Sequence, residues 1–391
     1  MFKRIYSKKA LAAALCSVML MSVAACGASE EASEAESSSS SIFESISETA
    51  PVETPAEETE TPAEEVTVSN EPYVLPEGMY FSELTGEPIS EAIRDQRPIA
   101  VMVDNEKTAL PHYGTSEADV VYELMNSTKN DRITRLMCIV KDWGSIEQLG
   151  SIRSTRPTNI LLAAEWNAVL CHDGGPLYND QYFAREWSAH FSGTFSRINN
   201  GKAREFTEYI VSGDLDSNFS NYSGKAGYET TYNQYANEGS HFKFVEYGTE
   251  FKLSDRYSKT YTANIAALPF THNMSQLVYN SETGEYEYYE YDDRHEDAED
   301  GAPLSFKNVI LQKCTFTQLD DNGYLIYNCI DPGNNGWYLT NGEAKDIAWN
   351  KLTETGKTVY YDENGSELEI NTGKTYIALI PADSWDLVTF Q

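Results

Sequence analysis

The hydrophobic pattern of this chain changes character near residue 250. Before that point, continuous apolar runs at 97–104, 118–125 and 133–140 predict strands that are buried on both faces. Residues 157–167 predict a helix, because a proline opens the segment and suits the first helical turn. The first part of the folded region is therefore expected to mix strands with helices.

Three further segments complete this first part. Residues 166–172 predict another buried strand, and residues 201–212 predict a second helix. Residues 218–239 are rich in Asn, Tyr, Ser and Gly, which predicts a loop-like insertion.

Helical periodicity ends at about residue 253. From there, short runs of Tyr, Val, Ile, Thr and Phe alternate with turn signals such as Thr283-Gly284 and Asn322-Gly323. Short strands at regular spacing with such turns are typical of an antiparallel sandwich or barrel. The predicted fold class is α+β, with a mixed α/β domain at 73–250 and an antiparallel, all-β domain at 251–391.

Residues 1–25 have the three parts of a secretory signal. A basic start precedes an apolar run at 10–23, which is shorter than the about 20 strongly apolar residues of a permanent membrane helix. The run ends in Val23-Ala24-Ala25-Cys26, which resembles the lipobox of bacterial lipoproteins. That resemblance implies cleavage before Cys26 and lipidation of its sulfur; an ordinary signal with an incidental cysteine is the alternative.

An acidic segment follows the lipobox. Residues 27–71 contain 13 Glu and no Lys, Arg or Asp, and Ser, Thr, Ala and Pro fill most other positions. Such a composition buries too little apolar surface to offset the entropy of ordering, and like charges extend the chain. Residues 26–72 are therefore expected to be a disordered tether that holds the folded part away from a membrane.

The overall charge argues against nucleic acid as a partner. The formal net charge is −32 at pH 7, although the signal itself is basic. A surface of this sign repels DNA, RNA and anionic lipid headgroups.

Four cysteines lie beyond the lipobox, and none belongs to a C-x-x-C pair, which excludes zinc ribbons and thioredoxin-type motifs. Cys138 and Cys171 lie in apolar runs and are expected to be small buried hydrophobic residues. Cys314 and Cys329 face each other if a hairpin is symmetric about the turn at 321–322. Opposed residues in an antiparallel ladder are close enough for a disulfide, so a disulfide or a pair of neighbouring thiols is expected.

Several motifs, taken in order, resemble the YerB-like lipoprotein family. They are Arg-Pro-Ile-Ala-Val-Met-Val-Asp-Asn at 97–105, Ala-Asp-Val-Val-Tyr-Glu at 118–123, Ile-Thr-Arg at 133–135, Gly-Ser-Ile-Arg-Ser-Thr-Arg at 150–156, His-Asp-Gly-Gly at 172–175, Lys-Asn-Val-Ile-Leu-Gln at 307–312, and the segments 342–349 and 373–381. The resemblance covers about 97–381. It implies a two-domain extracytoplasmic lipoprotein whose biochemical activity is not established.

The best candidate for a ligand site combines residues 150–157 with residues 172–176. Arg153, Ser154 and Arg156 immediately precede the predicted helix, whose N-terminus offers free N–H groups and a positive dipole end. His172 and Asp173 follow a predicted buried strand. An anionic ligand would suit such a site, and carboxylates of wall peptides or phosphates of wall polymers are the obvious candidates.

Two more polar residues are expected to converge on this place. Glu123 ends one predicted strand and Arg135 lies in another. The purely structural alternative is that Arg153 or Arg156 pairs with Glu123 or Asp173 and that His172 only ends a strand.

The sequence contains few signs of catalysis. Cys171 and His172 are neighbours in a predicted strand and must point to opposite faces. Ser154 lacks a G-x-S-x-G setting, and there is no P-loop and no H-E-x-x-H. The acidic run at 292–300 lacks the spacing of a calcium loop and is expected to be a solvated loop. No cofactor and no metal site are predicted.

The sequence therefore favours a lipid-anchored extracytoplasmic protein that acts as a non-catalytic binding module. Its expected partners are the membrane, through the anchor, and an anionic cell-envelope ligand or an envelope protein. The alternative is an enzyme that acts on the cell wall, such as a peptidoglycan hydrolase or transpeptidase.

Overall fold

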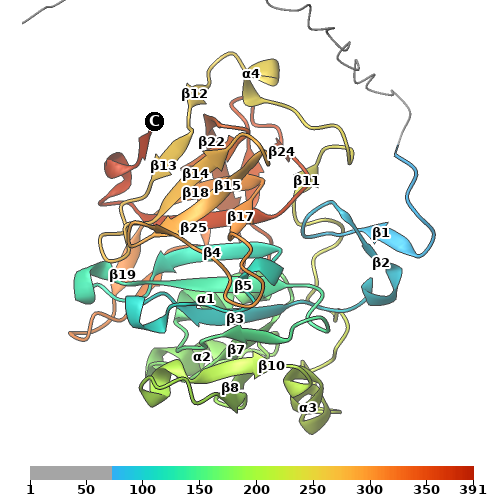
Figure 1. Cartoon of the computed structure of the whole chain (residues 1–391), viewed down its shortest axis with the longest axis vertical. Helices are drawn as coiled ribbons and strands as arrows, with labels where there is room; N and C mark the ends of the chain where they lie inside the picture. The colour runs from blue at the N-terminus through green and yellow to red at the C-terminus, as the bar shows by residue number, and fades with distance from the viewer. Residues whose placement is uncertain (1–72) are drawn as a thin grey trace, which may run out of the picture. The chain divides into compact units, whose positions relative to one another are not determined.

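The computed structural model of the chain describes residues 73–391 (Figure 1). The expectations for the signal, for Cys26 and for the tether concern residues outside this range. No helix among the described residues is long and apolar enough to cross a membrane.

The three apolar runs form adjacent strands, as predicted. They are β3 (Ile99–Asp104), β4 (Val120–Met125) and β5 (Thr134–Val140), and every residue in them is buried. β5 lies between the other two and pairs antiparallel with both. Because side chains on both faces are covered, the apolar pattern is continuous rather than alternating.

One sheet of 11 strands runs through both halves of the described region. β25 (Thr375–Pro381) pairs in parallel with β4 on one side and with β18 (Asn308–Cys314) on the other (Figure 1). The strand order is β12-β22-β21-β18-β25-β4-β5-β3-β7-β8, with β23 beside β22. The remaining members are β7 (Val169–His172), β8 (His190–Ser192), β12 (Tyr261–Thr262), β21 (Asp331–Thr340), β22 (Glu343–Lys351) and β23 (Val359–Tyr361).

One prediction about the second half of the chain is wrong. The strands after residue 253 were predicted to be purely antiparallel, but both pairings of β25 are parallel. All seven residues of β25 are buried, so the strand is a central one, covered on both faces and paired along both edges. Central, doubly covered strands are the setting in which parallel pairing occurs.

The other sheets are smaller. A six-stranded antiparallel sheet contains β13 (Ile265–Ala267), β14 (Gln276–Asn280), β15 (Glu285–Glu290), β16 (Asp293–Arg294), β17 (Ser305–Phe306) and β26 (Thr389–Phe390). A three-stranded sheet contains β6 (Gln148–Gly150), β9 (Ser196–Arg197) and β10 (Glu208–Val211). Three two-stranded pairs are β1 (Met79–Phe81) with β2 (Pro88–Ser90), β11 (Lys243–Phe244) with β24 (Glu369–Ile370), and β19 (Phe316–Gln318) with β20 (Leu325–Tyr327).

Two hydrophobic cores lie on the two faces of the large sheet. Val101 and Val103 of β3 belong to one core, which also contains Tyr286 and Tyr288 of the six-stranded sheet. Ala100 and Met102 alternate with them and belong to the other core, which contains the buried face of α1 (Pro157–Glu165). The period of two along β3 therefore distributes its side chains between two different layers.

The remaining helices are short, and one predicted helix is wrong. Residues 201–212 form a 3-10 turn followed by strand β10, which pairs with β6 and β9. The helix in this region, α3 (Asp214–Asn221), begins after Gly213. The φ of Gly213 is 86°, in the left-handed region that favours glycine. Pairing with two neighbouring strands outweighs the local helical preference of 201–212. The other two helices are α2 (Asp180–Phe183) and α4 (Leu253–Arg256).

The hairpin of β19 and β20 has the predicted register. Phe316 pairs with Tyr327 and Gln318 with Leu325, so the turn is symmetric about residues 321–322. Continuing this register places Cys314 opposite Cys329. Both side chains are buried in the same core and are free thiols in this structure.

Candidate functional site

The two predicted site segments lie side by side. The Thr155 amide donates to the Gly174 carbonyl at 3.2 Å, and the Asp173 amide donates to the Arg153 carbonyl at 3.0 Å. The first segment leads into α1, and the second leaves the end of β7. Their side chains, however, have different partners, which are described below.

Arg135, Arg153 and Arg156 form an arginine cluster, in which Arg135 and Arg153 pair with Asp104 at the end of β3. The Arg153 Nε lies 2.6 Å from the Asp104 carboxylate, and Arg135 lies 3.7 Å from it. The Asp104 side chain is fully buried, whereas that of Arg153 is 22% exposed and also pairs with Glu205. Arg153 is therefore the partner of a buried carboxylate rather than a free cation.

Arg156 is held by oxygen atoms of the main chain. It donates to the Asn126 carbonyl at 3.0 Å and to the Thr155 carbonyl at 2.9 Å, and its guanidinium lies over the Tyr324 ring. Burial, followed by the charge of Arg135, lowers the pKa of Arg156 to about 9. Ser154 accepts a hydrogen bond from this same guanidinium at 3.3 Å.

The arginines do not pair with the two acids named as structural partners in the sequence-based alternative. Asp173 pairs with Arg197, which also contacts Glu208. Glu123 makes no ion pair with any described residue. Arg135 and Arg153 instead pair with Asp104 and Glu205, which the sequence analysis did not single out, and Arg156 has no ion pair among the described residues.

The Glu123 side chain lies beside the core that contains Tyr288 and Tyr376, and its carboxylate accepts several hydrogen bonds there. Its fully buried carboxylate accepts from Thr134 at 2.7 Å, Asn273 at 2.7 Å, Ser275 at 2.8 Å and Tyr288 at 3.1 Å, and also from Tyr376. Most of these donors come from the second half of the chain. Glu123 therefore joins the two halves and lies apart from the arginine cluster.

His172 is the inner member of a pair of histidines. Its Nδ1 lies 2.8 Å from the Gly174 carbonyl, which can only accept, so Nδ1 carries the proton. Its Nε2, 3.0 Å from the Nδ1 of His190, must then accept from that atom. Burial lowers the pKa of both rings to about 4, and Phe183 stacks on both. His172 is buried, and His190 is the half-buried ring in front of it.

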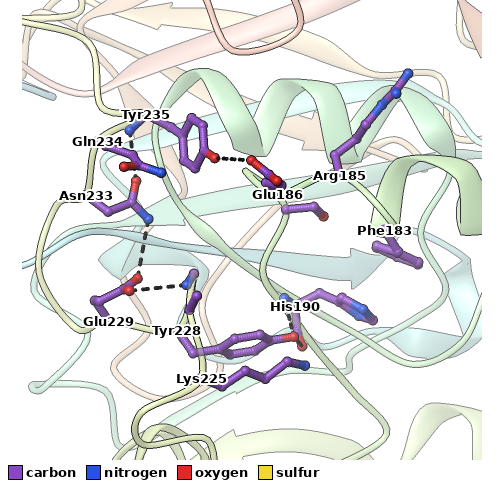
Figure 2. A pocket seen from close by; sticks show the side chains of 13 residues that line it. Phe183, Arg185, Glu186, His190, Lys225, Tyr228, Glu229, Asn233, Gln234 and Tyr235 are labelled. Carbon is purple, nitrogen blue, oxygen red and sulfur yellow. Dashed lines mark hydrogen bonds between the residues drawn. The ribbon is translucent and has the colours of Figure 1, made fainter.

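His190 lines a pocket of about 580 Å³, which we call the tyrosine pocket (Figure 2). The pocket lies between the segment that leads into β8 and residues 225–235. Its lining combines aromatic rings, two cations, two carboxylates and two amides: Phe183, Tyr228 and Tyr235; Arg185 and Lys225; Glu186 and Glu229; Asn233 and Gln234.

Contacts within the tyrosine pocket hold these groups in place. The Tyr235 hydroxyl donates to Glu186 at 3.2 Å, and the Tyr228 hydroxyl donates to the His190 carbonyl at 3.0 Å (Figure 2). The Lys225 ammonium lies 4.4 Å from the centre of the Tyr228 ring. A ligand here would meet aromatic faces, charges of both signs and amide groups.

Sequence reasoning did not identify the tyrosine pocket. Residues 218–239 were expected to be a loop-like insertion, and most of this segment is irregular. Its Asn and Tyr content, beside charged residues, was the available signal. What brings it to His190 is tertiary packing, because Tyr228 belongs to the same core as Phe191.

Two comparisons with known families and proteins concern most of the chain. Residues 84–229 match the family described as "Protein of unknown function (DUF3048) N-terminal domain", and residues 266–377 match the corresponding C-terminal domain. The Bacillus subtilis (strain 168) protein called "Putative lipoprotein YerB" is 24% identical over 305 residues, which cover 76% of this chain and 85% of that protein.

A solved structure has the same fold. The crystal structure of the YerB protein from Bacillus subtilis matches with a TM-score of 0.65 at 20% sequence identity. The match covers 78% of this chain and 98% of that one.

Proposed function

This chain belongs to the YerB-like lipoprotein family, defined by its two DUF3048 domains, and from that premise we propose that it is a lipid-anchored binding protein of the cell envelope. In this proposal, lipid on Cys26 holds the folded region at the outer face of the membrane. Residues 26–72 act as the spacer, and the tyrosine pocket binds the ligand.

The composition of the tyrosine pocket carries this proposal. Lys225, which pairs with no carboxylate among residues 73–391, suits a ligand carboxylate, and the half-exposed Arg185, which pairs with Glu354, can add a second donor. Glu186 and Glu229 suit amines. The aromatic faces suit sugar rings or aliphatic side chains. Carboxylate, amine and sugar occur together in muropeptides, the disaccharide-peptide fragments of peptidoglycan, and we propose these as the ligand class.

The observations favour binding over the enzymatic alternative. Burial raises the pKa of the Cys171 thiol far above its usual range, so it is a poor nucleophile. Among the described residues, Ser154 Oγ has a hydrogen bond only with Arg156, which cannot act as a base.

Titration of the full-length protein in detergent with purified muropeptides tests the proposal. We expect saturable binding by calorimetry and a loss of about tenfold in affinity for Lys225→Glu, because the reversed charge repels the ligand carboxylate. Lys252→Glu is the control, since Lys252 is exposed and does not line the pocket. Equal affinity of both variants would refute the assignment of the site. Binding of glycerol-phosphate polymer alone would refute the ligand class.

A further inference from the structure

A second cluster of functional groups, formed by His112, Glu290 and His295, lies in the interior, away from the tyrosine pocket. All three side chains are buried, with exposed fractions of 0%, 2% and 4%. One potential ligand atom from each lies within 4.8 Å of the other two. Glu290 is the last residue of β15, and His295 follows β16.

The hydrogen bonds of His112 fix which of its nitrogens is free. Its Nε2 lies 2.5 Å from the Asp104 carbonyl oxygen, which can only accept, so the proton is on Nε2. The Nδ1 therefore holds a lone pair, and this buried atom has no partner. A histidine that donates one N–H to a backbone carbonyl and presents its other nitrogen is the usual arrangement of a metal ligand.

Glu290 has an unpartnered atom of the same kind. Its Oε1 lies 2.9 Å from the His295 Nδ1, but its buried Oε2 has no hydrogen-bond partner. A buried acceptor without a hydrogen-bond partner is destabilising. Two such acceptors in one cluster are suited to bind a group that accepts electron pairs.

His295 can supply the third nitrogen. Its Nε2 lies 3.1 Å from the Thr115 hydroxyl, which can donate or accept, and its Nδ1 lies 2.9 Å from the Glu290 carboxylate, to which it can donate. A metal ion bound by these two side chains would replace the Nδ1 proton. No lysine or arginine within 73–391 pairs with Glu290, so the carboxylate has no other cation. The nearby Asp297 carboxylate is occupied by the Gly114 and Ser116 amides, at 2.9 Å each.

We propose that His112, Glu290 and His295 bind one divalent transition-metal ion, of which Zn²⁺ fits best. Two imidazole nitrogens and one carboxylate are ligands of the types that zinc prefers, and they leave one position of a tetrahedral site for a water molecule.

Such an ion would be structural, because the cluster is closed to solvent. His112 lies in the N-terminal family domain, whereas Glu290 and His295 lie in the C-terminal one. The metal would therefore link the two domains. Sequence spacing could not reveal this site, because His112 lies far from its partners along the chain. The expectation that 292–300 is a solvated loop is wrong for His295 and Asp297, which are buried.

Metal analysis of the full-length protein, purified without chelators, tests the proposal. We expect elemental mass spectrometry to find about one zinc ion per chain. Chelation should lower the melting temperature, and added Zn²⁺ should restore it. Co²⁺ in the stripped protein should give the visible absorption of a tetrahedral site.

Variants of the cluster distinguish a specific zinc site from nonspecifically bound metal. Glu290→Gln and His112→Gln keep side-chain size and should abolish both zinc retention and the effect of chelation on the melting temperature. His272→Gln is the control, because His272 is not a member of the cluster. A wild-type protein without metal even after incubation with Zn²⁺, or equal zinc content in all variants, would overturn the proposal and leave a water molecule as the occupant.

Discussion

At the residue scale, burial decides the role of each predicted site residue. The sequence places Arg153 and Arg156 before a helix, which suggests an anion site. In the structure their charges face Asp104 and main-chain carbonyls, so their donors are already used. A cation that neutralises a buried acid contributes to stability and is not free for a ligand.

This difference has a measurable consequence for Arg153. Arg153→Ala leaves the Asp104 carboxylate buried with only Arg135, 3.7 Å away. We expect the free energy of unfolding, measured with urea, to fall by about 3 kcal/mol or more.

Arg132→Ala is the control for Arg153, because its pair with Asp383 is partly exposed. This change should cost less than about 1 kcal/mol. If Arg153→Ala instead keeps full stability and loses affinity for muropeptides or phosphate, the arginine cluster is the ligand site and the tyrosine pocket is not.

At the scale of elements, strand pairing outweighs local preference. Residues 208–211 form β10 because two neighbouring strands complete their hydrogen bonds. The β19–β20 hairpin shows the opposite case, in which the local turn signal was enough to predict the register.

That register leads to a prediction about Cys314 and Cys329. The Asn328 amide donates to the Thr315 carbonyl at 2.9 Å, so the cysteines occupy the next, non-hydrogen-bonded pair. In an oxidising extracytoplasmic compartment we expect a disulfide, which would stabilise the fold by about 3 kcal/mol for a loop of this length.

Alkylation of the denatured protein, with and without prior reduction, counts these thiols. Cys138 and Cys171 should react in both cases, and Cys314 and Cys329 only after reduction. The double variant Cys314→Ser/Cys329→Ser should show no difference between the two conditions. Four reactive thiols in unreduced protein isolated from the cell envelope would contradict the prediction.

At the scale of the whole molecule, the two family domains share one sheet. β25 of the second half pairs with β4 of the first along five residues, and Glu123 accepts hydrogen bonds from Ser275, Tyr288 and Tyr376 across the same junction. These contacts couple the two domains, which the proposed metal would also join.

The proposed location of the whole protein is tested at Cys26. Cys26→Ala removes the sulfur that would carry the lipid, so we expect the variant to lose labelling by radioactive palmitate and to leave the membrane fraction. Cys16→Ala is the matched control, because Cys16 lies inside the apolar run, and it should keep both properties. Equal membrane association of the Cys26 variant would show that something other than lipid holds the protein.

The sequence by itself determined the strands β3, β4 and β5, the start of α1, the hairpin register and the family. Each of these depends on apolar runs, turn residues or motifs that are local in the chain. The tertiary structure alone decided that β25 pairs with β4, that Asp104 pairs with Arg135 and Arg153, and that His112 lies beside Glu290 and His295. These contacts join residues far apart in sequence, and they arise from packing across a sheet, which no local pattern encodes.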